Sequence, residues 1–333
     1  MRKRARVRCT KWNTTVLAAF AKDDPLSNSR AGTTVNNFSY IDVRPIAGTI
    51  GAEIHGVDLT KPLGEAVFRE VQSAFFEYLV VFLPQPKPLG PADLRRFAAQ
   101  FGTLDEAPFV FPFKLPGIEG YPEVYNNIKH ADDGGLNIGG FWHADVTYRA
   151  KPHKGSVFYA KEVPEYGGDT MFANQYLAYE TLPDDMKRTL DGLEAVHSSA
   201  MPHGQAPARF AAVSRDHVPD DNDKVFGSTK HELAAVDVIE HVHPVVRVHP
   251  ETKRKVLYVN RAFTSRFVGQ SEAESLPLLE ALWAHACQPE FTCRYRWQQH
   301  TVGIWDNCAT QHYAINDYYG QRRHMQRVAI HED

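Results

Sequence analysis

The pattern of hydrophobic and polar positions along this chain predicts many short strands and only a few helices. Strands are indicated where aliphatic, β-branched and aromatic residues gather between turn residues, as in Val80-Val81-Phe82-Leu83. The predicted strands lie at 41–54 (a pair), 80–83, 123–128, 141–148, 152–160, 169–172, 243–248, 256–260, 291–297, 302–306 and 323–330.

Five segments carry helical signals instead. In 63–78 apolar residues recur at helical spacing, which is typical of a helix that packs against a core. Pro91 begins a second helix and Gly102 follows its end. Ser271-Glu272-Ala273-Glu274 is a capping box, and the helix that it opens could break at Pro277. The predicted helices lie at 63–78, 91–101, 175–182, 184–191 and 271–287.

Two stretches fit neither pattern. The stretch 103–122 is rich in proline and phenylalanine, and 198–231 is polar, with several prolines and an acidic cluster at 220–223. Long segments without periodicity often cover a binding site, so both are predicted to be lid loops or pocket walls.

The order of elements predicts one domain over residues 40–333, preceded by an extension over 1–39. Many short strands, with a few early and inserted helices, are typical of a double-sheet jelly roll. The predicted fold class is therefore β-rich (α+β), with helices flanking and interrupting the strands. No internal repeat is visible.

Composition and charge narrow the range of partners. The chain has 333 residues, a formal net charge of −3 and a pI near 6.6, so no overall positive field favours nucleic acid. No apolar run approaches the roughly 20 residues that a membrane-spanning helix needs. The 4 cysteines form no Cys-x-x-Cys pair, which suits a reducing compartment rather than a disulfide framework.

The first forty residues differ from the rest of the chain. Seven basic residues, six of them within the first eleven positions, precede the first acidic residue, Asp23. Such a composition occurs in organellar transit peptides, but no cleavage signal is readable, so a disordered basic tail or an upstream start codon is the preferred interpretation. A cytoplasmic protein is expected, with an organellar location as the alternative.

A possible metal site begins with a His-x-Asp pair. Four His-x-acid pairs occur, and only His143 and Asp145 lie in an aromatic and β-branched segment. On a strand these two side chains would share one face. With His312 they would form a 2-His-1-carboxylate triad, which leaves positions of an octahedral iron(II) open for a bidentate cosubstrate and for dioxygen.

Arginines near the C-terminus are candidate anion ligands. Arg323 and Arg327 would share one face of the final strand, about 13 Å apart. A guanidinium matches a carboxylate with two parallel hydrogen bonds, so each can hold an anion. The neighbouring Arg322 is interpreted as a surface residue.

Matching motifs in the same order give the chain a specific resemblance. It resembles the taurine/2,4-dichlorophenoxyacetate dioxygenase family of iron(II)- and 2-oxoglutarate-dependent oxygenases over about residues 40 to 331. The segments that carry the resemblance are 47–54, 56–59, Trp142-His143-Ala144-Asp145-Val146-Thr147, Tyr166-Gly167-Gly168-Asp169-Thr170, His243-Pro244-Val245-Val246-Arg247, Leu257-Tyr258-Val259-Asn260, Trp305-Asp306-Asn307, Gln311-His312-Tyr313-Ala314 and Gln321-Arg322-Arg323.

The resemblance implies a double-stranded β-helix and an enzyme that uses iron(II), 2-oxoglutarate and dioxygen. It implies that His143, Asp145 and His312 hold the iron. Thr170 and Arg323 would bind the distal carboxylate of 2-oxoglutarate. Arg327 would bind the substrate, although a role in binding 2-oxoglutarate stays open.

The substrate implied by the resemblance is a small organic anion, such as an alkyl or aromatic sulfate, sulfonate or carboxylate. Taurine-specific relatives carry a sulfonate-binding histidine where this chain has Ala107, and Asp105 and Glu106 beside it would repel a sulfonate. An apolar wall is indicated by Phe109, Phe111 and Phe113. We therefore expect taurine to be a poor substrate.

Two other functions fit part of the pattern. A zinc hydrolase could use the same three ligands with a metal-activated water, but it would have no evident need for Thr170 and Arg323. A jelly-roll ligand-binding protein without catalysis would need a pocket but not three metal ligands. The oligomeric state is left open, and a homo-oligomer is compatible with the sequence.

Overall fold

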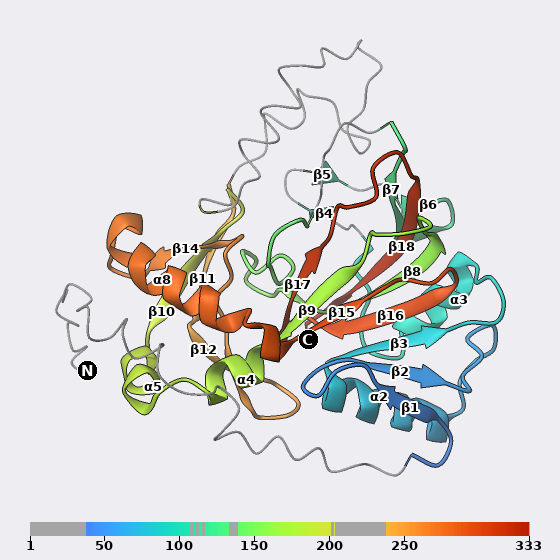
Figure 1. The fold of residues 1–333 in the computed structure, drawn as a ribbon, viewed down its shortest axis with the longest axis horizontal. Helices are drawn as coiled ribbons and strands as arrows, with labels where there is room; N and C mark the ends of the chain where they lie inside the picture. The colour runs from blue at the N-terminus through green and yellow to red at the C-terminus, as the bar shows by residue number, and fades with distance from the viewer. Residues whose placement is uncertain are drawn as a thin grey trace.

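A computed structural model describes residues 38–106, 109–110, 113–114, 117–132, 139–200, 203 and 238–332, with the backbone alone at 109–110 and 113–114. Most of the predicted basic extension and most of the polar stretch 198–231 therefore lie outside the described residues, as do the side chains of Ala107 and of the three phenylalanines after it. Figure 1 shows the arrangement of the described elements.

The largest sheet has eight strands in the order β1-β2-β3-β16-β8-β18-β7-β6. All neighbours pair antiparallel except β2 and β3. The strands are β1 (Asp42–Pro45), β2 (Ala52–His55), β3 (Val80–Pro84), β6 (Gly117–Ile118), β7 (Tyr121–Lys129), β8 (His153–Glu162), β16 (Thr301–Asp306) and β18 (Arg323–His331).

A smaller sheet packs against it, in the order β15-β9-β17. Its strands are β9 (Thr170–Asn174), β15 (Thr292–Tyr295) and β17 (Thr310–Ala314). Aromatic rings join the two sheets: Phe82 of β3 stacks on Tyr295 of β15 at 3.5 Å between centroids, and it meets Phe172 of β9 edge-on at 5.8 Å. This double-sheet jelly roll is the predicted fold.

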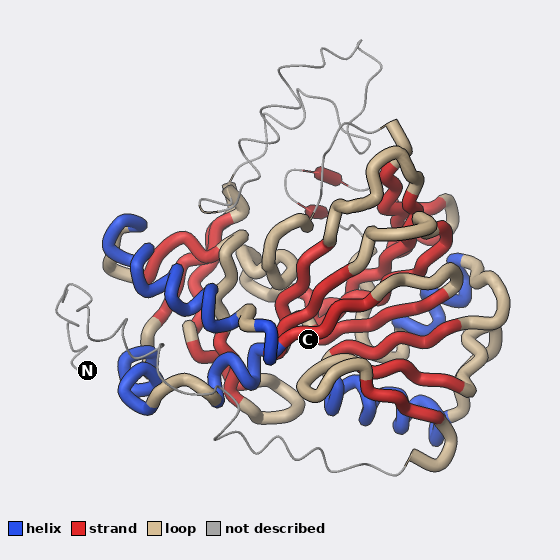
Figure 2. Tube along the Cα trace, in the orientation of Figure 1, coloured by secondary structure: helices blue, strands red, loops and turns tan. Residues whose placement is uncertain are grey.

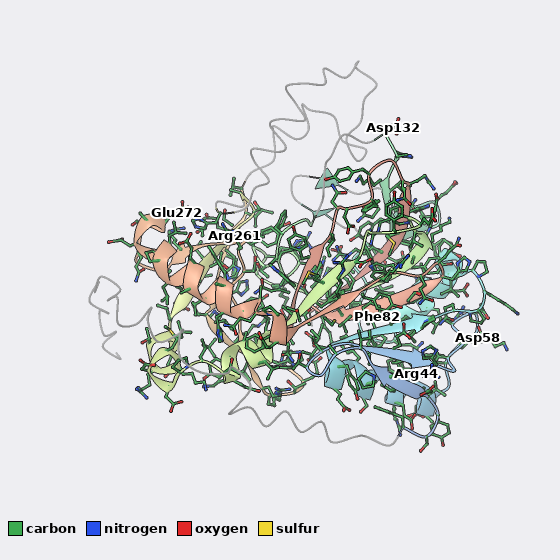
Figure 3. All side chains as sticks on the ribbon, viewed as in Figure 1. Arg44, Asp58, Phe82, Asp132, Arg261 and Glu272 are labelled. Atoms are coloured by element: carbon green, nitrogen blue, oxygen red, sulfur yellow. The ribbon has the colours of Figure 1, made fainter. Side chains whose placement is uncertain are left out.

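The other face of the large sheet is covered by α2 (Glu65–Tyr78) and α3 (Pro91–Ala98). Val81 and Leu83 of β3 pack in the same apolar cluster as Phe75 of α2 and Phe97 of α3. Because successive strand residues point to opposite faces, β3 buries Phe82 between the sheets and its neighbours under the helices. In Figure 3, Phe82 lies inside the molecule, whereas Arg44 and Asp58 lie at its edge.

The remaining elements form a separate apolar cluster beside the small sheet (Figure 1). They are α4 (Gln175–Glu180), α5 (Asp184–Leu190), β10 (Glu194–Ser198), β11 (Glu240–Pro244), β12 (Val246–Val248), β13 (Lys255–Leu257), β14 (Thr264–Phe267), α8 (Glu272–Ala286) and the 3-10 helix η2 (Pro289–Phe291). Figure 2 shows helices in two places, on this side of the molecule and against the large sheet, with the strands between them.

Most of the predicted elements are present, with differences at their ends. The predicted capping box begins α8, where Ser271 and Glu274 bond each other's backbone N–H groups. The break allowed at Pro277 does not occur, since α8 is continuous through this residue. The stretch 103–122 was predicted to be irregular, but it contains the short antiparallel pair β4 (Phe109–Val110) and β5 (Phe113–Lys114), as well as β6.

The prediction of a strand over 141–148 is wrong. His143 forms only an isolated bridge to His312, and the chain turns at 145–148. Val146 has a φ of 47°, a left-handed conformation that no strand contains. Its β-branched side chain favours a strand in general, but here tertiary contacts decide the backbone conformation.

None of the helices among the described residues is long and apolar enough to span a membrane. Cys287, Cys293 and Cys308 are free thiols. Burial raises the pKa of each of these three thiols, so they remain protonated at neutral pH.

Candidate active site

Two side chains that are close in sequence and a third far along the chain converge in one buried site. His143 and Asp145 come from the turn between β7 and β8, and His312 comes from β17. The Nε2 atoms of both histidines lie 3.8 Å from Oδ1 of Asp145. One donor atom from each of the three residues lies within 4.8 Å of the others, so a single ion can contact all three at about 2.1 Å after small adjustments.

The two histidines are aligned by their own backbones. The His143 N–H donates to the His312 carbonyl at 3.1 Å, and the His312 N–H donates to the His143 carbonyl at 2.7 Å. This pair of bonds, rather than a continuous strand, fixes the turn against β17. The prediction that His143 and Asp145 face the same way holds, although the predicted reason for it was wrong.

Asn307 holds the main chain of Asp145. Its Oδ1 accepts from the Asp145 N–H at 2.6 Å, and its Nδ2 donates to the Asp145 carbonyl at 3.0 Å. The same Nδ2 donates to the carbonyl of His153 in β8 at 2.9 Å. One buried amide therefore fixes the position of the carboxylate in the turn, a role that the sequence did not reveal.

The protonation of the imidazoles suits metal binding. Nδ1 of His143 donates to the Phe141 carbonyl at 2.8 Å, which leaves the lone pair on Nε2. Burial lowers the pKa of His143, and burial with the neighbouring His143 lowers the pKa of His312 further. Both rings are therefore neutral near pH 7, the form in which histidine binds metals.

Asp145 has the opposite electrostatic surroundings. Burial alone would raise the pKa of its carboxyl group, but the Arg327 guanidinium outweighs burial and holds the pKa below its ordinary value. The carboxylate is thus ionised at neutral pH. Two neutral imidazoles and one carboxylate form the donor set that non-haem iron(II) sites use.

Arg327 lies against this carboxylate rather than in a separate anion site. Its Nη2 donates to Oδ2 of Asp145 and, at 2.7 Å, to the hydroxyl of Ser156. Its Nε donates to the same hydroxyl at 3.2 Å. Sequence reasoning missed Ser156, because a serine inside a strand carries no signal of its own.

Arg323 and Thr170 lie on two different sheets and are both buried. The Thr170 hydroxyl accepts from Trp297 Nε1 at 2.9 Å, so its own proton is free to point at a ligand. Arg323 is 8% exposed, and its Nε has no hydrogen-bond partner among the described residues. A buried guanidinium with an unpaired donor is stabilised by a bound anion.

Gly168 brings the strand of Thr170 close to Arg323. A Cβ at Gly168 would lie 3.4 Å from Arg323 Cδ and 3.2 Å from Tyr318 Cδ1, and the residue has a φ of 70°. Both the spacing and the backbone conformation therefore favour glycine here.

A family model described as "Taurine catabolism dioxygenase TauD, TfdA family" matches residues 42–329. The chain belongs to this family. Being a TauD/TfdA-family member, the protein is a 2-oxoglutarate-dependent dioxygenase that uses iron(II), 2-oxoglutarate and dioxygen. The zinc hydrolase and the non-catalytic binding protein are thereby set aside.

Two relatives resemble this TauD/TfdA-family chain over most of their length. The chain is 34% identical to an alkylsulfatase of Acinetobacter baylyi over 295 residues, covering 89% of this chain and 86% of that protein. It is 35% identical to an alpha-ketoglutarate-dependent sulfate ester dioxygenase of Pseudomonas putida over 293 residues, covering 87% and 89%.

Solved structures of similar proteins support the fold. A taurine dioxygenase from Burkholderia xenovorans superposes with a TM-score of 0.69 at 34% identity, covering 89% of this chain and 92% of that one. AAD-2, solved with Mn(II) and N-oxalylglycine, superposes with a TM-score of 0.67 at 27% identity, covering 89% and 98%.

One part of the substrate interpretation is wrong within this TauD/TfdA fold. Asp105 is buried, and its Oδ2 accepts from Arg149 Nη1 at 3.2 Å and lies 3.0 Å from His153 Nε2. Its charge is compensated inside the protein, so it does not repel a substrate anion. Glu106, which the interpretation also invoked, is exposed. Ala107 lies outside the described residues.

Proposed function

We propose that His143, Asp145 and His312 hold the iron(II) of this dioxygenase. The observation that carries the proposal is the convergence of their donor atoms within 4.8 Å in a buried site. The tautomer of His143, the neutral imidazoles and the ionised carboxylate all fit a divalent first-row ion.

We further propose that Thr170 and Arg323 bind the distal carboxylate of 2-oxoglutarate. Two features support this: the unpaired Nε of the buried Arg323 and the free hydroxyl proton of Thr170. The bound iron supplies the chemistry that couples decarboxylation of 2-oxoglutarate to oxidation of a C–H bond by dioxygen. The protein residues bind and orient both substrates around it.

We propose that the substrate is the sulfate ester of an alkyl or aryl-alkyl alcohol. The two relatives named for sulfate ester chemistry support this class. Hydroxylation at the carbon that bears the ester oxygen would give an unstable intermediate. As its hydroxyl group loses a proton and forms a carbonyl, the carbon–oxygen bond to sulfate breaks, so an aldehyde and sulfate leave.

Arg327 is the proposed contact for the sulfate group. Within the described residues its hydrogen bonds come from Nε and Nη2, which leaves Nη1 for an anion. Its guanidinium lies 5.2 Å from the Trp305 ring centroid and 5.8 Å from that of Phe158. An arginine packed against aromatic rings presents a fixed donor to a ligand.

The test is succinate formation with a panel of anions. Purified protein receives iron(II), 2-oxoglutarate and either octyl sulfate, octanesulfonate, a phenoxycarboxylate or taurine. Octyl sulfate is expected to stimulate succinate formation with equal release of sulfate, and His143→Ala, Asp145→Ala and His312→Ala are expected to abolish it. Wild-type turnover in any of the three variants would contradict the metal assignment. A higher kcat/KM for taurine than for every larger anion would contradict the proposed substrate class.

A further inference from the structure

The two oxygens of the Asp145 carboxylate have different surroundings. Oδ1 lies 3.8 Å from Nε2 of both His143 and His312. Oδ2 instead accepts from Arg327 Nη2 and lies 3.5 Å from the Ser156 hydroxyl. Only one oxygen of the carboxylate is therefore turned toward the histidines.

This asymmetry matters because of the number of open positions. An octahedral ion bound by two imidazoles and one carboxylate oxygen keeps about three positions, which are needed for the two oxygens of 2-oxoglutarate and for dioxygen. A carboxylate that bound through both oxygens would fill one of these positions. The site must therefore keep Oδ2 away from the ion.

We propose that Ser156 and Arg327 together hold Oδ2 of Asp145 so that the carboxylate binds iron through Oδ1 alone. The inference rests on the proposed metal site. It makes Ser156 a positioning residue, and it gives Arg327 a role on the metal side of the site in addition to its proposed contact with the substrate.

The fold builds this arrangement from two neighbouring strands. Ser156 lies on β8 opposite Ala329 of β18, and Phe158 lies opposite Arg327, so the serine and the arginine are diagonal neighbours. Ser156 is fully buried and Arg327 is 9% exposed. With little water to compete, hydrogen bonds between such charged and polar groups hold a side chain firmly.

The Ser156 hydroxyl orients the guanidinium of Arg327. It accepts from both Nε and Nη2 of Arg327, which fixes the plane of the guanidinium. An arginine that only bound a substrate anion would not need its plane set toward a metal ligand. The hydroxyl is therefore expected to matter even when no substrate is present.

The experiment counts water molecules on bound Mn(II), a redox-silent replacement for iron, by line broadening in ¹⁷O-labelled water. Wild-type protein is expected to keep about three waters, and about one after 2-oxoglutarate binds. Ser156→Ala and Arg327→Gln are expected to keep about two waters on Mn(II), and none after 2-oxoglutarate binds, because in these variants Asp145 binds the ion through both oxygens. Arg322→Gln is the control and should match the wild type, because Arg322 is a half-buried arginine just before β18 that pairs with Glu162 instead of Asp145.

Each outcome has a distinct meaning. If Ser156→Ala keeps the same number of waters on Mn(II) as the wild type, the inference is overturned, even if the variant binds Mn(II) more weakly. Arg327→Gln could unfold, so circular dichroism is measured first and Ser156→Ala decides alone if needed. Two other results would instead contradict the proposed metal site itself. In the first, the wild-type protein does not bind Mn(II) stoichiometrically. In the second, His312→Ala does not abolish Mn(II) binding.

Discussion

At the scale of single residues, the same short pattern leads to two different structures. His249 and Glu251 repeat the spacing of His143 and Asp145, but Nδ1 of His249 accepts from the N–H groups of Glu251 and Thr252. Its Nε2–H therefore donates to Asp306, 2.8 Å away, instead of holding a lone pair toward a metal. Spacing alone could not separate the two cases, because the partner of each ring nitrogen is set by the tertiary structure.

The buried pair of His249 and Asp306 gives a stability prediction. Oδ1 of Asp306 accepts from the N–H groups of Cys308 and Ala309, and Oδ2 accepts from His249. Asp306→Asn replaces one acceptor by a donor, which leaves a buried clash, so urea unfolding should show a loss of about 2–3 kcal/mol. The exposed Asp42→Asn should change stability by less than about 0.5 kcal/mol. Equal effects would show that the buried pair is not structural.

Arg323 gives a prediction about the cosubstrate. Arg323→Lys should raise the apparent KM for 2-oxoglutarate at least tenfold, about 1.4 kcal/mol, because a lysine cannot donate two parallel bonds to a carboxylate. The KM for the organic substrate should change much less. Arg322→Lys is the matched control, since its guanidinium pairs with Glu162 at the surface. A KM for 2-oxoglutarate that stays at the wild-type value would remove the assignment.

At the scale of elements, the sequence predicted helices and strands best where buried residues recur at a regular spacing. In α2 the apolar stripe buries Val71, Ala74 and Phe75 as expected. The turn at 145–148 was mistaken for a strand, because its conformation depends on Asn307, which is distant in sequence. The strand β17, which carries His312, was not assigned, since its sequence Thr310-Gln311-His312-Tyr313-Ala314 lacks an aliphatic pattern and is buried by its neighbours.

The strand β11 gives a prediction about pH. Burial, with smaller contributions from His241 and Arg247, lowers the pKa of His243 to about 4. Between that value and the unfolded pKa near about 6.5, the unfolded chain binds a proton that the folded protein excludes. Stability should therefore fall as pH decreases through this range, by up to about 1.4 kcal/mol per pH unit for one histidine.

Urea unfolding at several pH values tests this, with His243→Gln compared with the wild type. Glutamine can still donate to the Arg149 carbonyl, which Nε2 of His243 contacts at 2.9 Å. The variant should show a smaller loss of stability between about pH 6.5 and pH 4.5. An unchanged slope would mean that His243 does not contribute to acid sensitivity, and His324, whose pKa burial also lowers to about 4, would be the next residue to test.

At the scale of the whole molecule, the site depends on both sheets at once. His312 belongs to the small sheet, Arg327 and Ser156 belong to the large sheet, and the turn with His143 and Asp145 connects two strands of the large sheet. The family resemblance could point to the three residues of the proposed metal site because its motifs keep their order in the chain. It could not identify Ser156 or the role of Asn307, because these depend on which strands lie side by side.

Because the proposed ligands come from different parts of the fold, ion binding should stabilise the whole protein. Mn(II) with N-oxalylglycine at about 100 times the dissociation constant contributes about 2.7 kcal/mol, which should raise the Tm by at least about 2 °C for a chain of this size. EDTA should reverse the shift. His312→Ala should show no such shift, whereas His55→Gln, a change on β2 outside the site, should behave like the wild type. An equal shift in His312→Ala would mean that the ion stabilises the protein at another place.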